Sequence, residues 1–320
     1  MTYSAGGLIQ ATDYNGFVST GSPAVNSTWG TGTSDAGWGQ SALSTVSVGA
    51  IVSATSWASL VNTISSMAAH QGTSITSRSA PSTGQTIAIL SNVGTDISSC
   101  YTNRLNAAAS GSQYTSWTGT NSKTTATSGA SWGITFTNTV TWASADAARY
   151  FFNAGGLIKI DLSKTSTGAT GDPEWNDLAT TLCGDIYITA GTGTQTIAGG
   201  SYTGTTKSGG TGTPTTLATT TGWYDLTTTP VVVYKQFADT APYTSNYIQH
   251  SLSTNAGATA LTITTLWQAA DAESDPITGG TAASGATPGT APCTIVTYFP
   301  PSTTYLSASW GTPTVSASVA

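Results

Sequence analysis

The residues of this chain that could carry out acid–base chemistry are few. The 320-residue sequence holds two glutamates, Glu174 and Glu273, and two histidines, His70 and His250. General acid–base catalysis depends on such side chains lying within hydrogen-bond reach of their substrate or of each other. His70 falls at the end of a predicted helix and His250 within a predicted strand, and neither belongs to a recognisable triad motif. We therefore predict no catalytic residue.

Three acidic residues at alternate positions, Asp271, Glu273 and Asp275, form a segment that could chelate calcium. The segment lacks the glycine and the distal bidentate acid of a helix-loop-helix calcium loop, so a solvated loop is favoured. Glu174 is expected in the first turn of a helix, where a negative charge stabilises the helix dipole. No metal site is predicted. A glycoside hydrolase that uses two aspartates brought together by the fold is a less favoured alternative.

The cysteines and the short motifs also favour a protein without cofactors. Cys100, Cys183 and Cys293 are odd in number and far apart, so neither a disulfide framework nor a zinc site is indicated. Buried free thiols are the expected outcome. The chain has no phosphate-binding loop, no H-E-x-x-H motif and no G-x-S-x-G in a strand-to-helix context. We expect no cofactor and no enzymatic activity.

Aromatic residues are more plentiful, with 10 Trp and 13 Tyr. Each buried Trp removes roughly 150–250 Å² of surface from water. Several of them fall on faces predicted to point inward, which favours packing in a core or an interface; these are Trp57, Trp132, Trp142 and Trp175. Two others, Trp223 and Trp310, lie in predicted loops. These two are candidate contacts for a glycan, because exposed indole rings can stack on sugars.

Charge is scarce, which bears on the partners of the protein. Lys and Arg number 8 and Asp and Glu number 14, only 7% of the chain, whereas about 25% is usual. The basic residues are scattered, so a nucleic-acid partner is not expected. Neither a signal peptide nor a membrane span is apparent. A surface rich in Ser, Thr and Gly suits a subunit of a larger assembly.

The first 75 residues are predicted to form a helical attachment region. Thr55–Ser56 offers a cap, and apolar residues then recur at three- and four-residue spacing from Trp57 to Met67. Gly72 supplies the helix stop. A second helix is expected to open at Asp13–Val18, which completes a helical hairpin.

A glycine-rich loop should connect these two helices. It contains two aromatic residues, Trp29 and Trp38, which we interpret as anchors, and Trp38 lies in the run Gly37-Trp38-Gly39-Gln40.

Residues 76–190 are predicted to form a central α+β domain. A helix is expected over Ile97–Ala109 and a long polar loop over Ser110–Ser131. Alternation of period two from Trp132 to Trp142 predicts a half-buried strand. Further elements of this domain are a helix capped by Ser144 over Ala145–Asn153, a strand at Leu157–Ile160, a helix opening at Asp172-Pro173-Glu174 that ends at Gly184, and a strand at Asp185–Ala190.

Residues 191–320 are predicted to form a Thr- and Gly-rich antiparallel β module, as hairpins or a small sandwich. The expected strands are Val231–Ala238, Tyr247–Ser253, Ala258–Trp267 and Thr294–Phe299. The predicted fold class is therefore α+β and rich in β structure. It comprises the helical hairpin, the central α+β unit and the C-terminal antiparallel module.

Part of the chain resembles virion structural proteins of tailed bacteriophages, many of them from marine and cyanobacterial phages. The resemblance rests on Asp13–Phe17, on the glycine-rich loop with Gly37–Gln40, and on the Trp57 helix that closes at Gly72. Its most distinctive part is the run Ala143–Gly156, after the Phe136 strand. It covers about residues 10–165 and thins out afterwards. Proteins of this kind are tail-fibre or neck-appendage components, so the resemblance implies a place in the particle and no catalytic residues.

These observations lead to one main expectation and three alternatives. The main expectation is a non-enzymatic component of a tail or neck appendage, made in the host cytoplasm and located in the virion. It would assemble as a homo-oligomer, a trimer or a ring, and contact other virion proteins. The alternatives are an adhesin that recognises host glycans, a capsid decoration protein, and a polysaccharide depolymerase.

Overall fold

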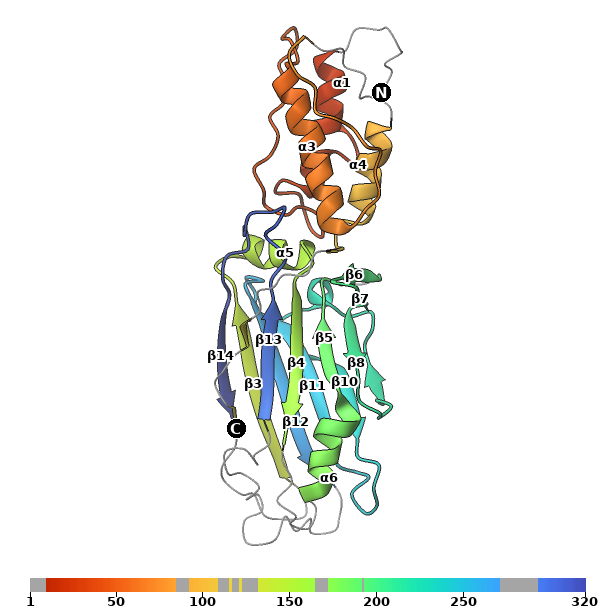
Figure 1. Cartoon of the computed structure of the whole chain (residues 1–320). Helices are drawn as coiled ribbons and strands as arrows, with labels where there is room; N and C mark the ends of the chain where they lie inside the picture. The colour runs from red at the N-terminus through yellow and green to blue at the C-terminus, as the bar shows by residue number, and fades with distance from the viewer. Residues whose placement is uncertain are drawn as a thin grey trace.

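The chain folds into an N-terminal helical region stacked on one end of a two-layered β-sandwich (Figure 1). The computed structural model describes residues 10–84, 92–108, 115–116, 121–122, 132–164, 172–191, 193–270 and 293–320. The predicted α+β class is confirmed. The expected loop over Ser110–Ser131 and the acidic segment Asp271–Asp275 lie wholly or almost wholly outside the described residues.

The helical region extends further along the chain than the expected boundary at residue 75, because a later helix packs against the first ones. Its elements are α1 (Ala11–Asn15), the π-helical turn η1 (Gly16–Thr20), α2 (Val25–Thr28), α3 (Ala54–Gln71) and α4 (Val93–Thr102). The helix predicted over Ile97–Ala109 therefore begins and ends earlier. Its last residue is Thr102, and Asn103 is its C-cap.

The longest helix, α3, shows how local sequence sets its limits. Its N-cap is Ser53, whose hydroxyl accepts a hydrogen bond from the Ser56 amide at 3.1 Å, two residues before the cap predicted from the sequence. At the other end Gly72 adopts a left-handed conformation with φ of 70°, which confirms the predicted stop. Trp57, fully buried, packs edge-on against Tyr14 of α1.

Two antiparallel sheets form the sandwich. The first has the order β1-β13-β4-β5-β8, with β2 also paired to β13. Its strands are β1 (Thr115–Ser116), β2 (Asn121–Ser122), β4 (Leu157–Ser163), β5 (Asp185–Ile188), β8 (Thr205–Ser208) and β13 (Cys293–Phe299). The second has the order β14-β3-β12-β11-β10-β9. Its strands are β3 (Trp132–Thr141), β9 (Thr216–Leu217), β10 (Val231–Phe237), β11 (Tyr247–Thr254), β12 (Ala260–Ala269) and β14 (Thr314–Val319).

Strand β3 confirms the alternation read from the sequence. Its even-numbered residues are buried and its odd-numbered residues are more exposed. It pairs with β12 along its whole length, from Trp132 opposite Ala269 to Thr141 opposite Ala260. On its other side it pairs with β14. A one-residue slip would turn the aromatic face outward, so burial determines the register.

Segments that are distant in sequence share both sheets. Strand β3 pairs with β12 and β14, and strand β4 pairs with β13. The boundary expected at residue 190 therefore runs through both sheets. Such pairing depends on contacts between distant residues, which local patterns do not encode.

Two helices complete the sandwich. Helix α5 (Ala145–Asn153) lies between the sandwich and the helical region in Figure 1, and Ser144 caps it as predicted. Helix α6 (Asp172–Asp177) continues as the π-helical turn η2 (Leu178–Cys183), lies toward the opposite end, and ends at Gly184 as predicted. A small sheet of β6 (Gln195–Ile197) and β7 (Gly200–Tyr202) and the 3-10 turn η3 (Trp223–Asp225) were not predicted.

Candidate functional site

The structure uses both histidines for packing. His70, fully buried at the end of α3, places Nε2 2.9 Å from the Ala154 carbonyl oxygen, and its ring meets Trp38 edge-on. His250, fully buried in β11, places Nδ1 2.9 Å from Thr265 Oγ1 and stacks on Tyr234. Burial lowers the pKa of both rings, to about 3 for His250. Neutral imidazoles in these positions pack in the core and form hydrogen bonds within it.

The thiols also behave as buried groups. Cys100 in α4 and Cys183 at the end of η2 are fully buried and free. Burial raises the pKa of each to about 12. A nucleophilic cysteine needs a lowered pKa and some exposure, so these two thiols are inert.

The two candidate glycan contacts lie inside the molecule. Trp223 is 6% exposed and stacks on Phe152 at a centroid distance of 5.1 Å. Trp310 is 2% exposed. Neither ring presents an open face, although Trp223 contributes to the lining of a pocket. A glycan contact through either residue stays a prediction.

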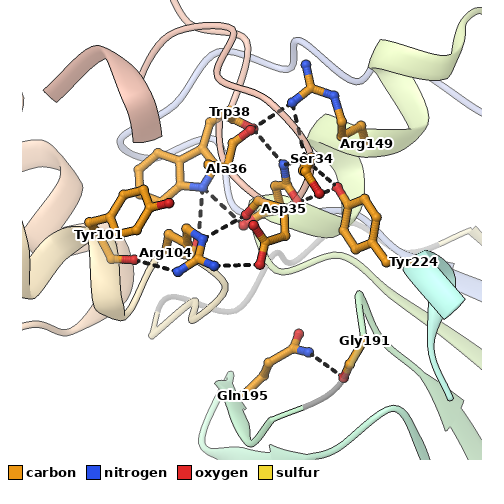
Figure 2. A network of polar contacts seen from close by, with 12 residues as sticks. Ser34, Asp35, Ala36, Trp38, Tyr101, Arg104, Arg149, Gly191, Gln195 and Tyr224 are labelled. Carbon is orange, nitrogen blue, oxygen red and sulfur yellow. Dashed lines mark hydrogen bonds and ion pairs between the residues drawn. The ribbon is translucent and has the colours of Figure 1, made fainter. Parts of the chain in front are cut away.

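A polar network, drawn in Figure 2, joins the helical region to the sandwich, and we call it the junction. Its centre is Trp38, whose indole is completely buried. Trp38 Nε1 lies 3.0 Å from the carbonyl oxygens of both Arg104 and Asn153, so one donor serves a loop after α4 and the end of α5. The aromatic anchor predicted at this position is confirmed.

The glycines on either side of Trp38 allow its backbone to lie close to neighbouring chain. Gly37 has φ of 94°, and a Cβ there would meet the Thr31 carbonyl. Gly39 has φ of 67°, and a Cβ there would meet the Tyr150 ring of α5. A larger residue at Gly37 would be strained and would distort the loop itself, whereas one at Gly39 would be strained and would push the loop away from α5.

Two arginines fasten the same loop from opposite sides (Figure 2). Arg104, after α4, forms an ion pair with Asp35 and donates from Nε to the Asp35 carbonyl at 3.0 Å. Arg149, in α5, donates to the Ala36 carbonyl at 2.7 Å and to the Thr31 carbonyl at 2.8 Å. Each guanidinium therefore binds backbone oxygens that have no partner in a helix or strand.

Asn153 and Tyr224 extend the junction to η3, the turn that lies between β9 and β10 of the second sheet. Asn153 is fully buried and donates from Nδ2 to the Gly37 carbonyl at 3.0 Å. The Tyr224 hydroxyl lies 2.7 Å from Asn153 Oδ1 and 2.9 Å from the Ser34 carbonyl oxygen. Burial raises the pKa of Tyr224 well above its usual range, so the phenol remains a neutral donor.

The segment between β13 and β14 adds a third attachment. Gln40 Nε2 donates to the Ser307 carbonyl at 2.9 Å, and the Ser307 amide donates to Gln40 Oε1 at 2.8 Å. Ser309 Oγ also donates to the Trp38 carbonyl. The run Gly37-Trp38-Gly39-Gln40 thus contacts α5, the chain after α4 and the C-terminal part of the protein.

A half-open pocket of about 210 Å³ lies beside the junction. Its lining combines Trp223 and Tyr224 with Asp146 and Arg149 of α5. Asp146 is the one carboxylate among the lining residues, and Arg149 Nη2 lies 3.0 Å from its Oδ1. The pocket offers aromatic and charged contacts for a small polar ligand, but not the second carboxylate that sugar hydrolysis needs.

The comparisons with known proteins yield no relative. The chain matches no model of a protein family, no curated protein and no solved structure. None of the helices in the described residues combines the length and the apolar character required to span a bilayer.

Proposed function

We propose that the chain is a non-enzymatic structural component of a tailed-phage virion, a tail or neck appendage subunit that assembles as a homo-oligomer with other virion proteins. The proposal follows from the resemblance over residues 10–165 and from the near-absence of charge. The elongated shape in Figure 1, with a helical region stacked end-on on a sandwich, suits a projecting subunit.

The observation that carries the proposal is an apolar tip at the far end of the helical region. The tip loop, residues 47–52, precedes α3 and exposes Val48 and Ile51, at 87% and 92%. Helix α3 has 18 residues and so spans about 27 Å. Its last turn contacts Ala154 beside the sandwich, so its first turn and the tip loop lie away from it. Two large apolar side chains left in water at such a place fit attachment to a partner.

The first test is the native mass. Recombinant protein measured by light scattering, with an unboiled denaturing gel beside it, should give a trimer or a larger closed ring. A monomer at all concentrations would contradict the proposed homo-oligomer. It would favour a decoration protein that assembles only on its particle.

The second test targets the tip loop itself. The double variant Val48→Ser, Ile51→Ser should fold normally but should be missing from purified particles, as measured by mass spectrometry. The matched control is Val231→Ser, a change of an apolar residue that is 38% exposed in the sandwich; it should still be incorporated. Equal incorporation of all variants would contradict attachment through this loop.

The pocket beside the junction favours a second candidate, recognition of a host glycan. Its lining includes Trp223 and Tyr224 together with Asp146 and Arg149, and pockets for small ligands combine aromatic side chains with a few polar groups. Ala145, exposed at the pocket, is the position to test, since Ala145→Trp fills the space without removing core residues. Host polysaccharide should bind the native protein and bind Ala145→Trp more weakly. Absence of binding to the native protein would remove this candidate.

A further inference from the structure

Three carboxylates meet near the end of the sandwich that lies away from the helical region. One carboxylate oxygen from each of Glu174, Asp177 and Asp239 lies within 4.8 Å of the others. Glu174 and Asp177 belong to α6, and Asp239 follows β10. We call these three residues the acidic cluster.

The members of the acidic cluster differ in exposure. Glu174 is 7% exposed, Asp177 is half-buried and Asp239 is exposed. Glu174 Oε1 is buried and has no hydrogen-bond partner. The acidic cluster is therefore closed to solvent at Glu174 and open to solvent at Asp239.

The charged groups that act on Glu174 are the other two carboxylates of the acidic cluster. In the described part of the chain, the ion pairs of the arginines and of Lys159 involve other carboxylates. A hydrogen bond from Thr240 reaches the Glu174 side chain, and the neighbouring charges are those of Asp177 and Asp239. Burying a carboxylate next to two others costs free energy unless a cation or a proton compensates.

We propose that the acidic cluster binds a calcium ion. Calcium is bound by six to eight oxygen ligands at about 2.3–2.6 Å, so two of its ligands lie at most about 5 Å apart. The three oxygens meet that limit. A ligand set made only of carboxylates disfavours zinc and copper, which prefer nitrogen and sulfur. The exposed side at Asp239 leaves room for the waters that complete the shell, whereas magnesium demands a stricter octahedron.

The position of the ion gives it a structural role, independent of the proposed function. Helix α6 follows β4 of the first sheet, and Asp239 follows β10 of the second sheet. A cation shared by them ties the two sheets together at this end. The opposite end is already held by the junction.

The test is calcium binding by the full-length protein after treatment with a chelator. Isothermal titration calorimetry and thermal unfolding should show saturable binding of calcium and a rise in the unfolding temperature. Terbium should bind with luminescence excited through the protein's tryptophans, of which Trp175 is the sequence neighbour of Glu174.

Two variants test whether calcium binds at the acidic cluster. Asp239→Asn removes an exposed charge and should keep the fold while calcium affinity falls at least ~10-fold, because affinity depends on the number of charged ligands. Glu174→Gln should also abolish the thermal response. The matched control is Asp161→Asn, a carboxylate of β4 outside the cluster, which should bind calcium like the native protein.

Three results would overturn the proposal. One is the absence of calcium binding at millimolar concentration in the native protein. Another is unchanged binding in Asp239→Asn, which would place the ion elsewhere. The third is a response to magnesium as large as that to calcium, which would refute the assignment of the metal. None of these results depends on assembly into a particle, so they are distinct from failure of the proposed function.

Discussion

The Trp and Asn side chains buried at the junction differ in their hydrogen bonds from those buried inside the sandwich. At the junction, the Trp38 indole and the Asn153 amide both reach backbone carbonyls. In the sandwich, the Asn138 amide and the indole nitrogens of Trp132 and Trp267 are buried without a protein partner. Hydrogen bonds depend on direction, whereas packing of apolar surface does not. The hydrogen bonds of Trp38 and Asn153 therefore favour one orientation of the helical region, whereas the side chains of Asn138, Trp132 and Trp267 contribute to the sandwich by packing alone.

The largest expected effect comes from emptying the centre of the junction. Trp38→Ala removes a fully buried indole and its two carbonyl contacts. It should lower the free energy of unfolding by about 3–5 kcal/mol. Urea unfolding followed by circular dichroism measures this loss. The helical region should also unfold before the sandwich, giving two transitions.

The control for this change is Trp29→Ala, since Trp29 is only partly buried and donates to a single carbonyl, that of Ser41. Its loss should be clearly smaller. Equal losses for the two variants would show that Trp38 has no special place in the junction.

The same substitution at two buried asparagines, one at the junction and one in the sandwich, should change the free energy of unfolding in opposite directions. Both Asn138 and Asn153 are fully buried. Asn153→Leu takes away the amide that donates to the Gly37 carbonyl and one of the two contacts of the Tyr224 hydroxyl, so it should destabilise the protein by about 2 kcal/mol. Asn138→Leu removes an amide that has no protein partner, so it should stabilise by about 1–2 kcal/mol.

Chemical denaturation of the two asparagine variants measures both changes. Destabilisation by both would mean that the Asn138 amide is satisfied in solution, and the contrast between junction and interior would fail at that position.

The sequence predicted local elements well and their assembly poorly. Alternation from Trp132 to Trp142 was sufficient for β3, and Ser144 for the start of α5. The run Gly37-Trp38-Gly39-Gln40 was recognised as a loop with an anchor, but not as the contact point of three distant segments. The sequence indicates only a helix-stabilising role for Glu174, because nothing local reveals Asp239 beside it. Contacts between distant residues are set by the packing of whole sheets.

The two buried histidines should make stability depend on pH to different degrees. An exposed histidine has a pKa near 6.5, and burial lowers that of His250 to about 3. Below pH 6.5 the unfolded chain therefore binds a proton that the folded chain does not. Stability is unaffected by this group above pH 6.5 and falls by about 1.4 kcal/mol per pH unit below it, or ~2 kcal/mol at pH 5.

The pKa of His70 is also lowered by burial, but its hydrogen bond to the Ala154 carbonyl opposes the shift. Replacing His250 by Phe should therefore flatten the fall in stability between pH 7 and pH 5 more than replacing His70 by Phe. Unfolding by urea at the two pH values measures it. The opposite ranking would show that the hydrogen bond at the junction does not hold His70 as described.

The smallest expected effect lies at the rim of the junction, where Asp146 pairs with Arg149. The Asp146 side chain is 66% exposed, so water and salt screen the pair. Asp146→Asn should therefore change the free energy of unfolding by less than about 0.5 kcal/mol. Arg149 would keep its bonds to the Thr31 and Ala36 carbonyls, and those bonds hold the loop. A loss above ~1 kcal/mol in low and high salt alike would mean that Asp146 orients the guanidinium, and that the junction depends on charge at its rim as well as on hydrogen bonds at its centre.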